Sequence, residues 1–229
     1  MKLGGVELKD VKNKSIRQLV ANFRNEYISN GIDEKTMSDD PIQQFEKWFS
    51  EALENKVLEP NAFHLSTCSE DGRPSGRVML LKGFSDEGFI FFTNYDSRKG
   101  NDLKKNANAS MTFLWLELYR QIRIEGSVSR IPAKDSDEYF HSRPRGSQVG
   151  AAVSAQSKAL SGRDDLENAA QELEKNFSGR EIPRPENWGG LLLKPIRIEF
   201  WQGRVNRLHD RILYEAADGG KWTRSRLYP

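Results

Sequence analysis

In Ile196-Arg-Ile-Glu-Phe-Trp-Gln-Gly-Arg-Val-Asn-Arg-Leu-His-Asp-Arg-Ile-Leu213, two predicted strands flank a polar segment. The first strand covers residues 191–202 and the second covers residues 211–215. A third strand, over residues 221–226, follows the turn signal Asp218-Gly-Gly220. Short strands joined by tight turns predict an antiparallel sheet.

Similar strands are predicted upstream of this stretch. They cover residues 62–67, 76–84, 89–93, 110–118 and 121–130. So many short strands favour an antiparallel sheet that closes into a barrel. In this prediction Arg77 and Lys82 lie on one strand and face opposite sides of the pleat, and the apolar run Val78–Leu81 between them is buried on both faces.

Helical periodicity precedes and interrupts the strands. Helices are predicted over residues 15–30, 42–53, 97–106, 135–141 and 164–177. Asp40-Pro41 gives the second of these an N-cap followed by proline at the first helical position. The expected fold is therefore α+β and mainly antiparallel β, with an N-terminal arm and helix over residues 1–40 and a single domain over residues 41–229.

The composition argues against several classes of protein. The chain has 229 residues, with 35 Lys and Arg against 33 Asp and Glu, a balance too even to predict broad binding to nucleic acid or to a membrane surface. It has no apolar N-terminal segment, and no apolar run approaches the ~20 residues of a membrane span. The one cysteine, Cys68, is expected to be a packed structural thiol and suits a reducing compartment. These features predict a cytoplasmic protein.

The polar segment of the opening stretch is the first candidate site. Arg207, His209 and Arg211 alternate there, so an extended chain would present them on one side. Arginine offers a rigid fork of donors to phosphate, and histidine changes protonation near neutral pH. The segment therefore indicates a site for an anionic ligand, with an exposed strand face as the alternative.

Two further segments suggest phosphate binding. Arg98 and Lys99 open a predicted helix whose N-terminal amides favour an anion, although a solvated helix start would have the same sequence. Tyr139, Arg143 and Ser147 are spaced four residues apart, as on one side of a helix. The proline after Arg143 breaks that helix and moves Ser147 into the next element.

Motifs for several common chemistries are absent from the sequence. It has no GxGxxG after a strand, no GxxxxGKS or GxxxxGKT loop, no CxxC pair, no HExxH and no GxSxG. The histidines His64, His141 and His209 are far apart in sequence, which makes a poor case for a metal. Metal-assisted hydrolysis and Ser-His-Asp acyl transfer are therefore disfavoured, and no metal site is predicted.

Together these blocks resemble the pyridoxine (pyridoxamine) 5′-phosphate oxidase family, from about residue 16 to the C-terminus. The matching blocks are Arg77–Lys82, Phe92–Lys99, Tyr139–Arg145, Ser147–Ala151, Trp188–Gly190, Glu199–Gly203 and Asn206–Arg211. The resemblance implies a split β-barrel that forms a homodimer with FMN at the subunit interface. It also implies oxidation of pyridoxine 5′-phosphate and pyridoxamine 5′-phosphate to pyridoxal 5′-phosphate in vitamin B6 metabolism. Dioxygen would accept the electrons, and hydrogen peroxide, with ammonia from the amine, would be the by-product.

The resemblance also assigns site residues. The substrate phosphate would be held by Lys82, Tyr139, Arg143 and Ser147. Arg207 and His209 would be catalytic and close over the pyridine ring, while Arg24, Asn25, Glu26 and Tyr27 would form a mobile arm over the substrate. The implied FMN contacts are Arg77, Val78, Met79, Leu80, Leu81, Lys82, Phe92, Thr93, Arg98, Lys99, Gln121, Gln156, Ser157, Trp201 and Arg211.

Two other functions stay open at this point. A split-barrel flavin reductase would share the flavin contacts but not the substrate set. A non-enzymatic barrel could bind a ligand or nucleic acid through Trp115, Tyr119 and Arg120, although the charge balance is poor for it. The chain also departs from the family pattern, since Phe92 stands where some members have tyrosine and a hydroxyl contact to the flavin would be missing.

Overall fold

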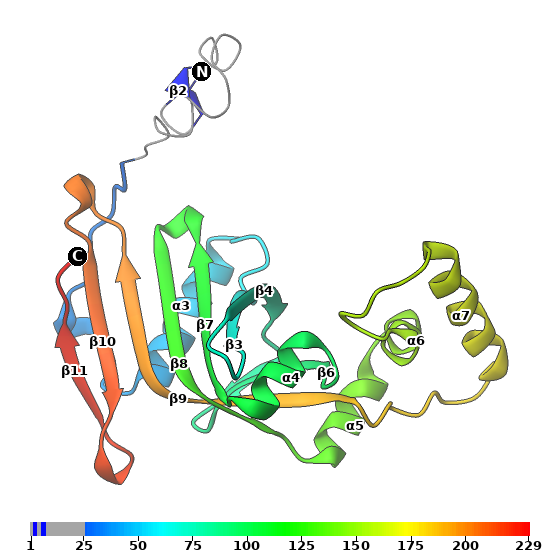
Figure 1. Cartoon of the computed structure of the whole chain (residues 1–229). Helices are drawn as coiled ribbons and strands as arrows, with labels where there is room; N and C mark the ends of the chain where they lie inside the picture. The colour runs from blue at the N-terminus through cyan, green and yellow to red at the C-terminus, as the bar shows by residue number, and fades with distance from the viewer. Residues whose placement is uncertain (1, 4–5, 8–25) are drawn as a thin grey trace.

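The computed structural model describes residues 2–3, 6–7 and 26–229. Within these residues, nine strands form one antiparallel sheet in the order β11-β10-β9-β8-β7-β3-β4, with β6 paired to β9 and β5 paired to β6 (Figure 1). A short pair, β1 (Lys2–Leu3) and β2 (Val6–Glu7), is separate from it. The strands of the sheet are β3 (Ala62–Cys68), β4 (Pro74–Leu80), β5 (Gly83–Ser85), β6 (Gly88–Asn94), β7 (Asn108–Trp115), β8 (Arg120–Arg130), β9 (Trp188–Gln202), β10 (Asp210–Ala216) and β11 (Trp222–Arg226).

Five α-helices lie among the described residues, at the places where the sequence predicts helices and directly after one of them. They are α3 (Pro41–Glu54), α4 (Arg98–Lys105), α5 (Ala133–Ser142), α6 (Arg145–Val153) and α7 (Arg163–Asn176). The predicted start of α3 is confirmed, because Asp40 Oδ1 accepts a hydrogen bond from the Ile42 amide at 2.7 Å. Figure 1 shows α3 against the sheet and α5, α6 and α7 together at one side of it.

Strand β9 is the longest strand and connects the two ends of the sheet. Its first half pairs with β6 and its second half pairs with β10, while β8 runs along both. The register with β8 shifts between Glu125 and Gly126, opposite Pro195. A Cβ at Gly126 would overlap the carbonyl oxygen of Lys194, so the bulge requires glycine. A bulge bends its strand, and the sheet curls into a half-barrel (Figure 1).

Aromatic side chains fill the inside of the curled sheet. Phe45 of α3 is fully buried, and its ring centroid lies 4.9 Å from that of Phe89 and 5.2 Å from that of Phe113. Trp48, one turn further along α3, packs edge-on against Phe200 at 5.1 Å. Burying each such ring contributes about 1.5–3 kcal/mol, so α3 closes the main core.

A second, smaller core lies under α5 and α6. It is formed by Phe140, Val149, Ile182 and Trp188. Because Trp188 is also the first residue of β9, this core fixes the helices to one end of the longest strand.

Two sequence predictions about the sheet are wrong. The strand expected over residues 76–84 is divided into β4 and β5, and Lys82 lies between them instead of on one strand with Arg77. The division occurs because the Lys82 amide donates to the carbonyl of Ile90 in β6, so the chain changes its pairing partner there. β4 is also an edge strand instead of a strand buried on both faces, with Val78 69% exposed and Leu80 38% exposed.

The helix predicted over residues 15–30 lies mostly outside the described residues. Its described part, residues 26–30, is not helical. Ser29 Oγ donates to the carbonyl of Gly203 at 2.6 Å, and the Ile32 amide donates to the Asp210 carboxylate at 2.9 Å. This segment is therefore bonded to the C-terminal part of the chain instead of to a helical turn. The domain boundary expected at residue 40 stays a prediction.

Among the described residues, every helix is too short or too polar to span a bilayer.

Candidate active site

The start of α4 gathers cationic and hydroxyl side chains. Ser97 is the N-cap, and its Oγ accepts a hydrogen bond from the Gly100 amide at 3.3 Å. Lys99 Nζ donates to Thr93 Oγ1 at 3.0 Å and to Gln156 Oε1 at 2.8 Å. The structure thus brings three residues predicted to bind flavin, Thr93, Lys99 and Gln156, into direct contact.

This cationic cluster carries more positive charge than its surroundings neutralise. Burial, and after it the nearby Arg77, lowers the pKa of Lys99 to about 8. Burial also lowers the pKa of Arg77, against the opposing effect of Asp102 and with a smaller contribution from Arg98. A phosphate would supply negative charge, and the N-terminus of α4 would favour it. These residues therefore fit the phosphate of FMN.

Two buried residues orient Arg77. Asp102 Oδ2 accepts a hydrogen bond from Thr67 Oγ1 at 2.7 Å, and Thr67 Oγ1 in turn accepts from Arg77 Nη1 at 2.9 Å. The Thr67 hydroxyl hydrogen is committed to Asp102, which leaves its lone pair for the guanidinium. Sequence reasoning missed Thr67 and Asp102, because they are 35 residues apart and belong to no recognisable motif.

An aromatic group lies next to this cluster along β6. Phe92, the neighbour of Thr93, stacks on Tyr139 with ring centroids 3.8 Å apart. Trp188 continues the stack, 5.5 Å from Phe92. The guanidinium carbon of Arg143, at the end of α5, lies 4.6 Å from the Trp188 ring centroid. Trp188 had no predicted role, and only its place in the Trp-Gly-Gly block marked it.

Arg143 has an unsatisfied donor. Its Nη1 is buried and has no hydrogen-bond partner among the described residues. Burial lowers the pKa of Arg143, which the nearby Tyr139 partly offsets. A buried guanidinium nitrogen without a partner is costly, whereas a phosphate offers acceptor oxygens in matching geometry. The geometry therefore supports a second phosphate site at Arg143 and Tyr139.

The other two residues predicted for the substrate phosphate are exposed. Lys82 lies between β4 and β5, and Ser147 lies in α6. The sequence prediction that Ser147 belongs to the element after Arg143 is confirmed, because α5 ends before Pro144 and α6 begins after it. The part of Lys82 and Ser147 in binding stays a prediction.

A third group lies at the other end of the sheet. The strand register places Gln121, Trp201 and Arg211 side by side on β8, β9 and β10, so their side chains share one face. Arg211 donates to Glu199 through Nε at 2.7 Å and through Nη2 at 3.0 Å. These hydrogen bonds raise the pKa of Arg211 and already neutralise its charge.

The prediction that Arg207 and His209 share one extended face is wrong. Arg207 is exposed and ends the 3-10 turn η4 (Val205–Arg207) with φ +60°, so the chain turns between the two residues. His209 is half-buried, with its ring 4.7 Å from that of Trp201. Its Nδ1 accepts from the Arg204 amide at 3.1 Å, so the neutral ring carries its proton on Nε2. Burial, and after it Arg207, lowers the pKa of His209.

The N-terminal arm reaches the same third group. The Tyr27 ring lies 5.1 Å from Tyr119 and 5.6 Å from His209. Glu26 is exposed. Arg24 and Asn25, the other residues predicted for the arm, lie outside the described residues.

The first two groups and the third group lie at opposite ends of β9 within one protomer. Trp188 at the start of β9 belongs to the aromatic group, and Trp201 near its end belongs to the third group. They are 201 − 188 = 13 residues apart, or up to about 43 Å at a rise of roughly 3.3 Å per residue. Figure 1 shows α5, which ends before Arg143, and the start of β10, which follows His209, at opposite ends of the sheet. No hydrogen bond or ring contact among the described residues joins Arg143 to His209.

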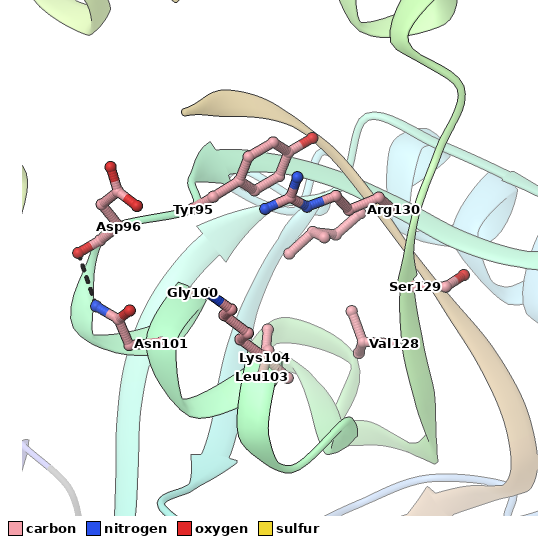
Figure 2. Close-up of a pocket in the computed structure, with 10 residues that line it drawn as sticks. Tyr95, Asp96, Gly100, Asn101, Leu103, Lys104, Val128, Ser129 and Arg130 are labelled. Atoms are coloured by element: carbon pink, nitrogen blue, oxygen red, sulfur yellow. Dashed lines mark hydrogen bonds between the residues drawn. The ribbon is translucent and has the colours of Figure 1, made fainter. Parts of the chain in front are cut away.

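A separate pocket of about 140 Å³ lies between α4 and the end of β8 (Figure 2). The guanidinium carbon of Arg130 covers the Tyr95 ring there, 3.9 Å from its centroid. None of the residues predicted to contact flavin or substrate lines this pocket. It is therefore distinct from the candidate active site.

The curled antiparallel sheet and the cationic start of α4 are those of a flavin-binding split barrel. Residues 49–177 match the family model described as pyridoxamine 5′-phosphate oxidase. Residues 188–229 match the model described as the pyridoxine 5′-phosphate oxidase C-terminal dimerisation region. The chain therefore belongs to the pyridoxine/pyridoxamine 5′-phosphate oxidase family.

Relatives share the chain almost from end to end. Proteins named pyridoxine/pyridoxamine 5′-phosphate oxidase are 50% identical over 212 residues in Salinibacter ruber and over 213 residues in Rubrobacter xylanophilus. These alignments cover 92% and 93% of this chain and 99% and 98% of the relatives. The resemblance found in the sequence is confirmed.

Solved structures show the same architecture. PhzG from Burkholderia lata, solved in complex with tetrahydrophenazine-1-carboxylic acid, has a TM-score of 0.83 and 32% identity, over 90% of this chain and all of that one. An FMN-binding protein from Nostoc punctiforme, related to pyridoxamine 5′-phosphate oxidase, has a TM-score of 0.66 and 17% identity, over 81% of this chain and 97% of that one. The latter shows the fold alone, and the predicted split barrel is confirmed.

Proposed function

We propose that this chain oxidises pyridoxine 5′-phosphate and pyridoxamine 5′-phosphate to pyridoxal 5′-phosphate with bound FMN and dioxygen. Family membership and the relatives at 50% identity support this chemistry. The observation that carries the choice of substrate is the presence of two separate cationic groups. Lys99 belongs to one and Arg143, with its unpaired Nη1, to the other. The second group would anchor the single phosphate of a small substrate beside the flavin.

The first cationic group holds the phosphate of FMN. Arg77, Arg98 and Lys99 supply the charge, while Thr93 and Gln156 orient the ammonium of Lys99. The exposed apolar side of β4 offers a surface for the ring, because apolar area left open to water favours a covering group.

The second group binds the substrate phosphate. The half-buried Arg143 and Tyr139 form its inner part, and the exposed Lys82 and Ser147 join them. Anchoring the phosphate fixes where the reacting carbon lies relative to the flavin, which is the main way a protein assists such a cofactor.

The third group completes the site from the second subunit of a homodimer. The dimerisation model covers residues 188–229, which include Trp201, Arg207, His209 and Arg211. Arg207 and His209 close over the pyridine ring with Tyr27 of the arm and exclude water. Bound FMN would supply the redox chemistry, in which two electrons leave the substrate carbon and reach dioxygen, giving hydrogen peroxide and, from the alcohol, the aldehyde. From the amine, the oxidised product takes up one water and gives the aldehyde and ammonia.

The test is an activity assay of the purified protein with pyridoxine 5′-phosphate and with pyridoxamine 5′-phosphate. We expect a yellow protein that releases FMN on denaturation, consumes dioxygen and forms pyridoxal 5′-phosphate and peroxide in equal amounts. Pyridoxine without its phosphate should be oxidised far more slowly. A protein that oxidises a nicotinamide cofactor but neither phosphate ester would favour the flavin reductase, and a colourless protein that takes up no FMN would favour the binding module. We also propose a cytoplasmic location, which cell fractionation would test.

A further inference from the structure

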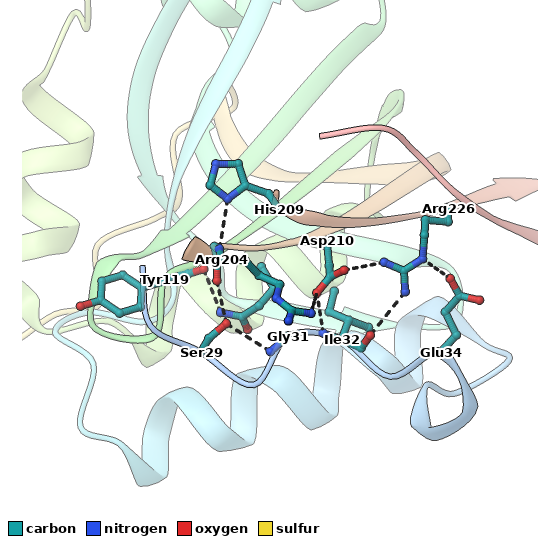
Figure 3. A network of polar contacts seen from close by, with 11 residues as sticks. Ser29, Gly31, Ile32, Glu34, Tyr119, Arg204, His209, Asp210 and Arg226 are labelled. Atoms are coloured by element: carbon teal, nitrogen blue, oxygen red, sulfur yellow. Dashed lines mark hydrogen bonds and ion pairs between the residues drawn. The ribbon is translucent and has the colours of Figure 1, made fainter. Parts of the chain in front are cut away.

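A buried carboxylate that has no predicted contact with ligand lies next to His209. Asp210 is only 7% exposed. Its Oδ2 accepts hydrogen bonds from the Ile32 amide at 2.9 Å and from Arg204 Nη1 at 3.2 Å, and its Oδ1 accepts from Arg226 Nη1 at 2.5 Å (Figure 3). One carboxylate thus joins three segments that are distant in sequence.

Further contacts surround this carboxylate and complete what we call the Asp210 network. Ser29 Oγ accepts from the Gly31 amide at 3.2 Å and donates to the Gly203 carbonyl at 2.6 Å. Arg226 Nε donates to Glu34 at 2.5 Å. The members are Ser29, Gly31, Ile32, Glu34, Gly203, Arg204, Asp210 and Arg226.

The network ends at two side chains that the proposed function places on the substrate. Arg204, whose guanidinium is held by Asp210, donates its amide hydrogen to His209 Nδ1 at 3.1 Å. Tyr27, which precedes the bonded N-terminal segment, packs against His209 at 5.6 Å and against Trp201 at 5.8 Å. The N-terminal segment and the loop of residues 203–209 therefore meet at one polar centre.

We propose that Asp210 is a positioning residue that fastens residues 27–34 to the loop of residues 203–209, so that Tyr27 and His209 reach the substrate as one unit. This inference rests on the proposed function, which places both side chains over the pyridine ring. Burial raises the pKa of Asp210, but hydrogen bonds from Ile32, Arg204 and Arg226 outweigh it, and the pKa lies below its usual value. The carboxylate is therefore charged at neutral pH and attracts both guanidinium groups.

Gly31 allows the two segments to approach each other. It has φ +78°, and a Cβ there would overlap Arg204 Nη1 and Asp210 Oδ2. Gly72 has a similar φ of +83°, but nothing lies within 4 Å of its Cβ position. Gly31→Ala therefore opens the network from its N-terminal side, and Gly72→Ala is a matched control for backbone strain alone.

The test uses Asp210→Asn, which keeps the side-chain volume. Its NH₂ group cannot accept a hydrogen bond, so it must face Arg226 or the donors Ile32 and Arg204. In the FMN-loaded protein, we expect kcat to fall about tenfold or more, since misplaced groups near a reacting centre cost that much. The KM for substrate and the FMN content should stay close to wild type, because Arg143 and Lys99, which are proposed to hold the two phosphates, make no contact with the Asp210 network among the described residues. Gly31→Ala should act likewise, and Gly72→Ala should leave kcat unchanged.

Hydrogen–deuterium exchange supplies a readout that does not depend on activity. In Asp210→Asn and in Gly31→Ala, amides of residues 29–32 and 203–209 should exchange faster together, while those of β8 should not change. The double variant, with both Asp210→Asn and Gly31→Ala, should have a kcat no lower than that of the single variant with the lower kcat, because both changes break the same network.

The outcomes separate this proposal from the proposed function. A wild-type protein that oxidises neither phosphate ester would end the proposed function, while the exchange pattern would still test the coupling of the two segments. An active wild type whose kcat survives Asp210→Asn would refute the role of Asp210. Faster exchange in only one of the two segments, or additive losses in the double variant, would refute it as well.

Discussion

The affinity for FMN is expected to fall as the pH rises through about 8, because Lys99 then loses its proton in the free protein. Its pKa is lowered to about 8 by burial and by the neighbouring Arg77. A bound phosphate stabilises the ammonium and raises this pKa again. Below pH 8 the ammonium is present before and after binding, so affinity is constant. Above pH 8 binding must take up a proton, so affinity falls with each further pH unit.

The expected size of this fall in FMN affinity follows from the pKa of Lys99. At pH 9, one unit above the pKa, about one Lys99 in ten is still charged, so FMN should bind about tenfold more weakly than at pH 7, or about 1.4 kcal/mol. The phosphate of FMN is mostly the dianion throughout this range, because its second pKa is about 6. The assay is the quenching of FMN fluorescence by apoprotein at pH 7–9 and constant ionic strength.

Two controls isolate the contribution of Lys99 to the pH dependence of FMN binding. Riboflavin, which lacks the phosphate, should bind with the same affinity at each pH. Lys99→Met should bind FMN more weakly at pH 7 and show no fall between pH 7 and 9. An affinity for FMN that is flat over this range in the wild type, or an equal fall in Lys99→Met, would refute the reasoning.

Four further substitutions test the fold and the site. Arg98→Ala should weaken FMN binding by about 1.5–3 kcal/mol, the usual contribution of a hydrogen bond to a charged group. A variant purified with a full complement of flavin would contradict a role for Arg98 in FMN binding. Arg143→Ala should raise the KM for pyridoxine 5′-phosphate much more than that for unphosphorylated pyridoxine, and equal effects on both would count against a phosphate site. Arg207→Ala should lower turnover strongly with flavin still bound, whereas near-normal activity would exclude Arg207 from the site. Phe45→Ala should lower the free energy of unfolding by about 3–5 kcal/mol in urea, because the ring is fully buried, and a loss under about 1 kcal/mol would show that the core tolerates the cavity.

The parts of the fold with a local cause could be predicted from the sequence. Asp40 and Ser97 cap α3 and α4 through their own side chains, and both helix starts were predicted. The end of β4 has no such local cause. It depends on the Lys82 amide pairing with Ile90 instead of continuing along β3, and the apolar run before it gave no sign of an exposed edge.

The same distinction applies to the site. The sequence identified residues by their resemblance to family blocks, and the structure brings Thr93, Lys99 and Gln156 into contact. It could not show that Arg143 and His209 lie at opposite ends of one strand. It also missed Asp210, whose bond to Ile32 spans 178 residues, because side-chain bonds between distant segments leave no periodic pattern.

The length of β9 has a genetic consequence. In the proposed homodimer, each of the two sites would be built from the Arg143 end of one subunit and the His209 end of the other. Two inactive alleles, one altered at Arg143 and one at Arg207, would then complement each other when expressed together. With random mixing, about half of the assemblies are hybrids with one intact site, so about a quarter of all sites regain function.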